Sequence, residues 1–241
     1  MIEMARRLVR QKFGSPIVVA LLALLALLIA FGAAGDGARG RAFQTASLAM
    51  IVLGAGAVSR DVSTGAVQMI LARPLSRTDY LLGRWLGVLA AFGVFLAVAA
   101  ALVVLFSVAV LPAFHAGPEP LSVPGLLRGG AGALLDGLLF SASLLCLSTF
   151  LPGYGDLVAY FLVVVGLGSL GGLGGALNRP ELVNAARVAR ENLMPDPDWN
   201  ALLAGQTSSL EPVGRWVLAV TALLLLAALI FRRREFAYGH D

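Results

Sequence analysis

The chain has 241 residues, of which 59% are hydrophobic and 13% are charged, and its formal net charge is +4. Soluble domains carry about 25% charged residues, so this composition excludes an ordinary soluble domain and indicates an integral membrane protein. The single cysteine, Cys146, excludes a disulfide framework within the chain. In a membrane protein an arginine excess is first a topology signal, and we expect no nucleic-acid partner.

The apolar residues fall into six runs, and a membrane-spanning helix needs about 20 such residues. The runs lack the alternation of barrel strands, and helices satisfy their own backbone groups in lipid. The runs are Pro16–Ala34, Phe43–Val58, Tyr80–Leu111, Gly125–Phe150, Leu157–Leu177 and Val213–Phe231. The sequence therefore predicts an all-α integral membrane protein, with six transmembrane helices in one membrane domain over residues 1–241.

Residues 1–14 form a basic, amphipathic stretch before the first run. A basic lead followed by apolar residues is also typical of a signal peptide. The run Pro16–Ala34 is longer than the apolar part of a signal peptide, and more spans follow it. We therefore expect a cytoplasmic N-terminal stretch and a retained first span.

The distribution of lysine and arginine predicts the orientation. With both termini in the cytoplasm, eleven of the 18 lysines and arginines lie inside. Four of the other seven lie in or beside one long loop, where the positive-inside rule is weakest. We expect both ends of the chain to be cytoplasmic.

The second and third runs have unusual lengths. The second is short, and we expect its helix to continue into the polar residues Ser59–Val62. The third exceeds one bilayer crossing at about 1.5 Å per residue. Its helix should tilt or project beyond the membrane.

The segment between these runs reads SRDVSTGAVQMILARPLSRTDYLLGRW, Ser59 to Trp85. Near its start it carries three residues of types that commonly cap helices, Asp61, Ser63 and Thr64. Behind them we expect a short amphipathic helix over residues 65–72. The apolar face of that helix carries Val67, Ile70 and Leu71. Pro74 ends it, because the residue before a proline avoids the helical region.

A new helix should begin directly after this stop. Ser76 followed by Asp79 has the spacing of a capping box. Arg77 and Arg84 lie at the expected cytoplasmic boundary of the third span. A short apolar-faced helix held between two caps suits insertion into a groove of another protein. The alternative is an ordinary cytoplasmic loop.

Asp136 lies near the middle of the fourth span, where a charge is costly and marks a pathway or an interior polar pair. Two interpretations stay open: an acid that lines a cavity, and a protonated or hydrogen-bonded clasp between helices. Arg128 is about 12 Å away along the same helix, too far to pair with it directly.

Glycines spaced four residues apart favour close helix packing. These pairs are Gly83/Gly87, Gly125/Gly129, Gly168/Gly172 and Gly171/Gly175. The alternative is that glycine is simply common in membrane helices. The dense cluster over residues 166–175 could equally loosen the outer end of the fifth span.

The outer loop, residues 178–212, is expected to be helical. Asn178 is expected to cap a helix whose first turn holds Pro180 and Glu181, and Pro195 and Pro197 stop it. A second short helix is expected around Trp199–Leu203. The first helix is amphipathic, so we expect it to lie at the outer membrane surface. The alternative is a solvated loop helix.

The residues of common catalytic sites are missing. A P-loop requires a Gly-Lys pair, and the one lysine, Lys12, follows Gln11. The two histidines, His115 and His240, fall in connections, which argues against an intramembrane serine protease. One cysteine and two distant histidines do not supply a metal cluster. We expect no enzyme activity, no metal and no cofactor in this chain.

The stretch SRDVSTGAVQMILARPLSRTDYLLGRWLG resembles the cytoplasmic segment of ABC-2 type permeases, especially the NosY-like branch of nitrous-oxide-reductase maturation. That family shows an acidic residue, a Gly-Thr pair, a short apolar helix, an "RP-[VIL]-S-R" motif and a helix beginning "LLGK". The matching residues are Asp61, Gly65, Arg73, Pro74, Leu75, Ser76, Arg77, Leu81, Leu82 and Gly83. Positions that differ from the usual family residues are Ser63, Thr64, Ala66 and Arg84.

The resemblance implies a type V exporter-like permease fold in the bacterial inner (plasma) membrane. It also implies a partner ATPase subunit that binds ATP and Mg, and two permease copies or paralogues per transporter. Residues 59–79, called the coupling segment below, would contact the ATPase. The residues expected to couple are Asp61, Gly65, Val67, Ile70, Leu71, Arg73, Pro74, Ser76, Arg77 and Asp79. Two alternatives remain: a secondary transporter or channel that works alone, and a scaffold subunit of a membrane complex.

Overall fold

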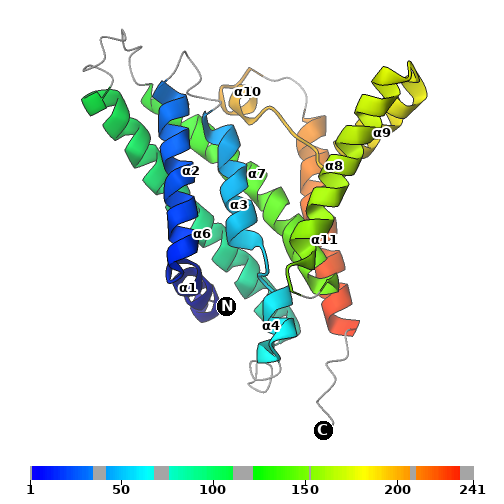
Figure 1. Cartoon of the computed structure of the whole chain (residues 1–241), viewed down its shortest axis with the longest axis horizontal. Helices are drawn as coiled ribbons and strands as arrows, with labels where there is room; N and C mark the ends of the chain where they lie inside the picture. The colour runs from blue at the N-terminus through cyan, green and yellow to red at the C-terminus, as the bar shows by residue number, and fades with distance from the viewer. Residues whose placement is uncertain are drawn as a thin grey trace. The chain divides into compact units, whose positions relative to one another are not determined.

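The computed structural model describes residues 2–34, 42–67, 76–110, 122–151, 153–206 and 210–233. All regular secondary structure in these residues is helical, which confirms the all-α prediction for them (Figure 1). The helices of the first half are α1 (Ile2–Phe13), α2 (Pro16–Ala34), η1 (Ala42–Ala46), α3 (Ser47–Gly54), α4 (Ser59–Ser63), α6 (Arg77–Leu105) and η2 (Phe106–Val110). Those of the second half are α7 (Val123–Phe150), α8 (Gly155–Ala176), α9 (Pro180–Leu193), α10 (Trp199–Leu203) and α11 (Glu211–Arg233).

Among the described residues, four helices are long and apolar enough to cross a membrane: Arg77–Ala109, α7, α8 and α11. A fifth is added if Ile2–Phe13 and Pro16–Gly32, which meet at an angle of 82°, are counted as one broken span. These helices are those of a membrane protein. The third predicted run corresponds to 33 helical residues, Arg77–Ala109. At about 1.5 Å per residue it exceeds the bilayer core, as its length in the sequence predicted.

The predicted continuation of the second span into Ser59–Val62 is wrong. The helix α3 ends at Gly54, and a turn over residues 55–58 separates it from α4. In this turn Gly56 has a φ of +69°, a left-handed conformation that a right-handed helix excludes and that glycine adopts without strain. The chain therefore changes direction where the sequence suggested a continuous helix.

The chain divides into two compact units. Unit 1 comprises Met1–Gly54, Leu82–Ser141 and Asp198–Ser208, and unit 2 comprises Ala55–Leu81, Ala142–Pro197 and Ser209–Asp241. In unit 1, α2 packs along η1 and α3. A Cβ atom placed on Gly87 of α6 would lie 3.0 Å from the Cα of Ala5 in α1, so glycine permits this close approach.

Helices α8 and α9 of unit 2 form an antiparallel hairpin. Gly174 of α8 lies against Leu182 and Val183, and a Cβ on Gly174 would come within 2.9 Å of both. Nearer the middle of α8, a Cβ on Gly171 would lie 3.8 Å from the Cβ of Ala186. The helix α9 therefore runs back along α8, which it follows in the sequence.

The helical character of the outer loop is confirmed, because α9 begins at Pro180 and α10 spans Trp199–Leu203. The predicted cap of α9 is wrong: Arg179 occupies that position, without a side-chain capping hydrogen bond. Asn178 has a φ of +51° and ends α8 instead. Its N–H donates to the carbonyl of Gly175 at 3.2 Å, and the N–H of Arg179 donates to that of Gly174 at 2.8 Å. This is a Schellman motif, in which asparagine tolerates the left-handed position.

Candidate functional site

After the stop predicted at Pro74, Ser76 caps the start of α6. The hydroxyl of Ser76 accepts the backbone N–H of Asp79 at 3.0 Å. The same hydroxyl donates to Oδ2 of Asp79 at 2.6 Å. The predicted capping role of Ser76 is confirmed. The carboxylate of Asp79 holds the hydroxyl proton of Ser76, and this orients the Ser76 oxygen as an acceptor.

Asp61 connects α4 to the first turn of α6. The phenol of Tyr80 donates to Oδ2 of Asp61 at 2.7 Å, and both residues are buried, with 0% of Tyr80 and 7% of Asp61 exposed. The ring of Tyr80 stacks on Phe231 of α11, with ring centroids 5.6 Å apart. A hydrogen bond to a carboxylate in such a site is stronger than a neutral one. This hydrogen bond therefore joins the start of the coupling segment to Tyr80, the residue directly after its end.

The turn before α4 is bound by side chains from α7 and α8. Ser148 is fully buried, and its hydroxyl oxygen accepts the backbone N–H of Val58 at 3.1 Å and that of Ser59 at 2.8 Å. Asp156, also fully buried, accepts the N–H of Gly56 at 2.9 Å. The hydroxyl of Ser59 donates to the carbonyl of Gly153 in the α7–α8 connection.

These contacts explain why the helix of the second run is interrupted. A buried backbone N–H needs an acceptor, and in a helix that acceptor is the carbonyl four residues earlier. In the turn that leads into the coupling segment, the acceptors are instead the side chains of Ser148 and Asp156. We call these two residues the turn clamp. The second carboxylate oxygen of Asp156 accepts the N–H of Leu157 at 2.9 Å, in the first turn of α8. An acid is favourable at a helix N-terminus, where the helix dipole is positive.

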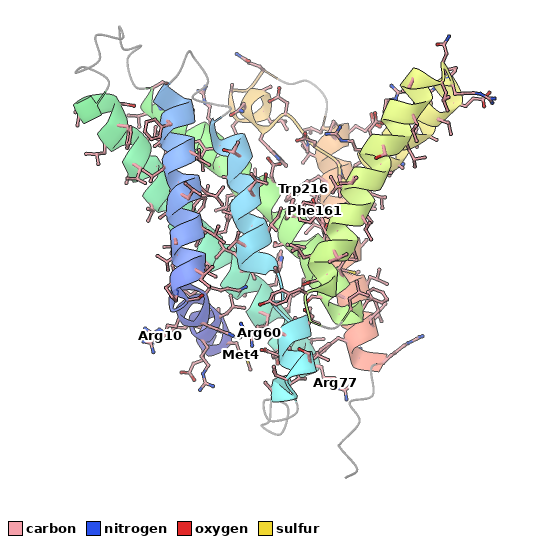
Figure 2. The ribbon with its side chains drawn as sticks, viewed as in Figure 1. Met4, Arg10, Arg60, Arg77, Phe161 and Trp216 are labelled. Atoms are coloured by element: carbon pink, nitrogen blue, oxygen red, sulfur yellow. The ribbon has the colours of Figure 1, made fainter. Side chains whose placement is uncertain are left out.

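Arg77 joins the start of α6 to the end of α11. Its Nη1 donates to the carbonyl of Arg232 at 2.9 Å and to that of Phe231 at 3.3 Å. Figure 2 shows Arg77 beside the lower end of α11. The last carbonyls of a helix have no partner within it, and a guanidinium both binds them and suits the negative end of the helix dipole. Arg77 thus binds a helix end of its own chain.

The remaining predicted residues of the coupling segment are placed as follows. Gly65 follows α4 with a φ of +70°, a conformation that favours glycine. Val67 is 1% exposed and is therefore covered by the protein itself. Residues Ile70, Leu71, Arg73 and Pro74 lie outside the described residues.

Ser63 and Thr64 bind the helix that precedes them. Their hydroxyls donate back to the carbonyl of Arg60, at 3.0 Å and 2.9 Å. They therefore bind the C-terminal end of α4, because the chain is already helical at Ser59. Asp61 is likewise inside α4, where its carboxylate is used by Tyr80. The printed contacts of these three residues are thus with α4 and α6, and most of the helix that they were expected to cap lies outside the described residues.

Asp136 lies in unit 1 and contacts α10. Its Oδ1 accepts the indole N–H of Trp199 at 2.6 Å, and the Trp199 side chain is 9% exposed. A Cβ on Gly132, one turn before Asp136, would lie 3.2 Å from the Cβ of Trp199, so the tryptophan packs closely over this glycine. Asp198 caps α10 by accepting the N–H of Ala201 at 3.0 Å. Of the two interpretations of Asp136, this geometry favours the clasp.

Four polar groups of these contacts were not singled out as partners from the sequence: Ser59, Tyr80, Asp156 and Trp199. Asp156 could have been found, because it follows the turn signal Pro152–Gly153 and opens an apolar run. Ser148 was not assigned a partner either. The backbone N–H groups that Ser148 and Asp156 accept from the turn lie 89 to 100 residues away in the chain, and no local pattern identifies them.

The described site thus brings together the turn before α4, the start of α6, the α7–α8 connection and the end of α11, all in unit 2. Comparison with known proteins identified no relative: no protein-family model matches the chain, and no curated protein is significantly similar to it.

Proposed function

We propose that the chain is the membrane-spanning permease subunit of an ATP-binding cassette transporter of the ABC-2 type. It has six spans and two cytoplasmic termini, and a separate ATPase subunit supplies the energy. The spans are α2, η1 with α3, α6 with η2, α7, α8 and α11. Two permease copies or paralogues assemble with the ATPase, and the transported substrate leaves the cytoplasm.

The observation that carries this proposal is the anchoring of the coupling segment. Its first residue is tied to α7 through Ser148, and Arg77 near its end is tied to α11. The turn just before the segment is tied to α8 through Asp156. The arginine distribution predicts that all these chain segments lie on one side of the membrane. A loop that only connects two spans does not need such attachment. A segment that must pass a push from a partner to the spans does need it.

The proposed mechanism is mechanical. The apolar face over residues 65–72, with Ile70 and Leu71, docks into a groove on the ATPase, as the family resemblance implies. Closure of the ATPase around ATP and Mg then pushes on this segment. The Ser76 cap and the Asp61–Tyr80 hydrogen bond pass the push to α6. The turn clamp passes it to α7 and α8, which the sequence-based proposal had not included. Arg73 pairs with acidic groups or helix ends of the partner.

The first test concerns the ATPase. The tagged chain is purified from native membranes, its ATPase partner is identified by mass spectrometry, and the two are co-expressed and reconstituted in nanodiscs. Ile70→Asp should lose the ATPase or its transport-linked hydrolysis, because an unpaired charge in a docking groove costs several kcal/mol. Val188→Asp, on an exposed position of α9, is the matched control and should retain both.

Two results would contradict the proposal. If Ile70→Asp binds the ATPase with full affinity and stays coupled, residues 65–72 are not the docking element. If the wild-type chain captures no ATPase, the lone-transporter and scaffold alternatives take its place. Orientation is checked separately with Thr78→Cys in a Cys146→Ala background: labelling by an outside-only reagent would show that the coupling segment is not cytoplasmic.

A further inference from the structure

The hairpin of α8 and α9 encloses a groove that the proposed function does not use. Its volume is about 550 Å³, and we call it the α8–α9 groove. Its apolar wall on α8 includes Val164, Leu167, Gly168 and Gly172, and its wall on α9 includes Arg187 and Arg190. Both walls belong to unit 2.

Two glycines of α8 widen this groove. A Cβ atom placed on Gly168 or Gly172 would meet no described atom within 4 Å. Gly174 differs, because a Cβ there would come within 2.9 Å of α9. Close helix packing therefore explains Gly174, and it does not explain the Gly168/Gly172 pair within this chain. The missing side chains leave an open apolar channel along α8.

The charge of the groove is positive. Arg187 and Arg190 line it, and no acidic residue is among its described lining residues. Of the nearby acids, Glu211 pairs with Arg215 at 2.5 Å. Glu191 lies 3.8 Å from Arg215 and 3.9 Å from Arg187, so it is shared between an arginine outside the groove and one that lines it. Among the described residues, no carboxylate lies within 4.0 Å of the Arg190 guanidinium.

Two guanidinium groups beside an open apolar channel fit an amphiphile with an anionic head. Arginine binds phosphate through paired N–H donors, which makes it well suited to a phosphodiester. An acyl chain laid along Gly168 and Gly172 would cover apolar surface that is otherwise open. We propose that the α8–α9 groove binds an anionic phospholipid, with its phosphate between Arg187 and Arg190 and an acyl chain along the glycines. This site is independent of the proposed transport function.

The test measures lipid binding to the purified full chain in detergent. Native mass spectrometry follows titration with phosphatidylglycerol and, in parallel, with phosphatidylcholine of the same acyl chains. The wild type should retain phosphatidylglycerol in preference to phosphatidylcholine. The double variant Arg187→Gln/Arg190→Gln should lose about tenfold or more in phosphatidylglycerol affinity, since two charge-assisted contacts are removed. Arg179→Gln, an exposed arginine at the other end of α9 and outside the groove, should bind as the wild type does.

A second variant tests the apolar half of the site. In Gly168→Leu/Gly172→Leu the new Cβ atoms meet no described atom within 4 Å, and the leucine side chains occupy the channel, so we expect the chain to fold and to lose phosphatidylglycerol. Equal binding of both lipids by the wild type, or unchanged binding by the arginine variant, would overturn the proposal. So would a leucine variant that keeps its lipid but converts a dimer to a monomer, because the groove would then hold a helix of a second copy.

Discussion

Two carboxylates in this chain show how differently an acid can be used in a membrane protein. Asp136 lies in the middle of α7 and accepts the indole N–H of Trp199 at 2.6 Å. Asp156 lies in the first turn of α8, is fully buried, and accepts two backbone N–H groups at 2.9 Å each. Asp136 thus binds a side chain of the short helix α10. Asp156 determines the path of the main chain before the coupling segment.

The comparison teaches that a conspicuous acid in the sequence is not the most constrained one in the fold. Asp136 stands out because apolar residues surround it on both sides. Asp156 does not, because acids are common in the first turn of a helix. Every residue except proline keeps its backbone N–H, so a buried N–H that loses its acceptor is left unsatisfied. We therefore expect Asp156 to matter more for stability than Asp136.

The largest expected effect is that of Asp156→Ala. It leaves the N–H of Gly56 without its acceptor in a buried site, and we expect a loss of about 3 kcal/mol. Asp156→Asn should lose less, since its remaining oxygen can still accept one of the two N–H groups. The measurement is thermal unfolding of the purified chain in detergent. If Asp156→Ala is no less stable than Asp136→Ala, the comparison is reversed.

An intermediate effect is expected for Ser148→Ala, which removes the acceptor of the Val58 and Ser59 N–H groups. We expect a loss of about 1–2 kcal/mol, because the lost acceptor is neutral. Since Ser148 and Asp156 hold the same turn, the double variant should lose less than the sum of the single variants. Ser169→Ala, at an exposed position of α8, is the control for removal of a serine hydroxyl. Strict additivity would show that the two residues do not act as one clamp.

The smallest effect is expected for the clasp in unit 1. Trp199→Phe keeps most of the ring over Gly132 and removes the N–H that Asp136 accepts, so we expect a loss of about 1 kcal/mol. The change should be much smaller in an Asp136→Asn background if the two residues act as a pair. If Trp199→Phe is as stable as the wild type and Asp136→Leu loses transport, the cavity interpretation of Asp136 is favoured instead.

Local signals in the sequence predicted local structure well. The Ser76 cap, the start of α9 at Pro180 and the short helix at Trp199 all depend on residues within one turn of one another. The break at Gly56 depends on acceptors that lie 90 to 100 residues further along the chain, in Ser148 and Asp156. Hydrophobic periodicity carries no information on such partners, so it predicted a continuous helix.

The same limit applies to the candidate site. The sequence identified Asp61 as important but assigned it to a cap, because a phenol 19 residues away was not recognised as its donor. It placed Arg77 at the start of the third span without indicating its bond to the end of α11. Asn178 was assigned to the helix that follows it, although asparagine suits both a cap and a left-handed turn. In each case the residue type indicated a polar or turn-forming role, and the fold determined which group the residue binds.

The bond between Arg77 and the end of α11 has a consequence for how the protein is made. The two carbonyl acceptors are 154 and 155 residues later in the chain than the guanidinium. At ordinary synthesis rates this separation corresponds to a delay on the order of ten seconds or more. Until α11 has been synthesised and inserted, the start of α6 lacks this anchor. The coupling segment therefore acquires this contact only at the last stage of biogenesis. A chain truncated before Phe231 lacks the contact altogether.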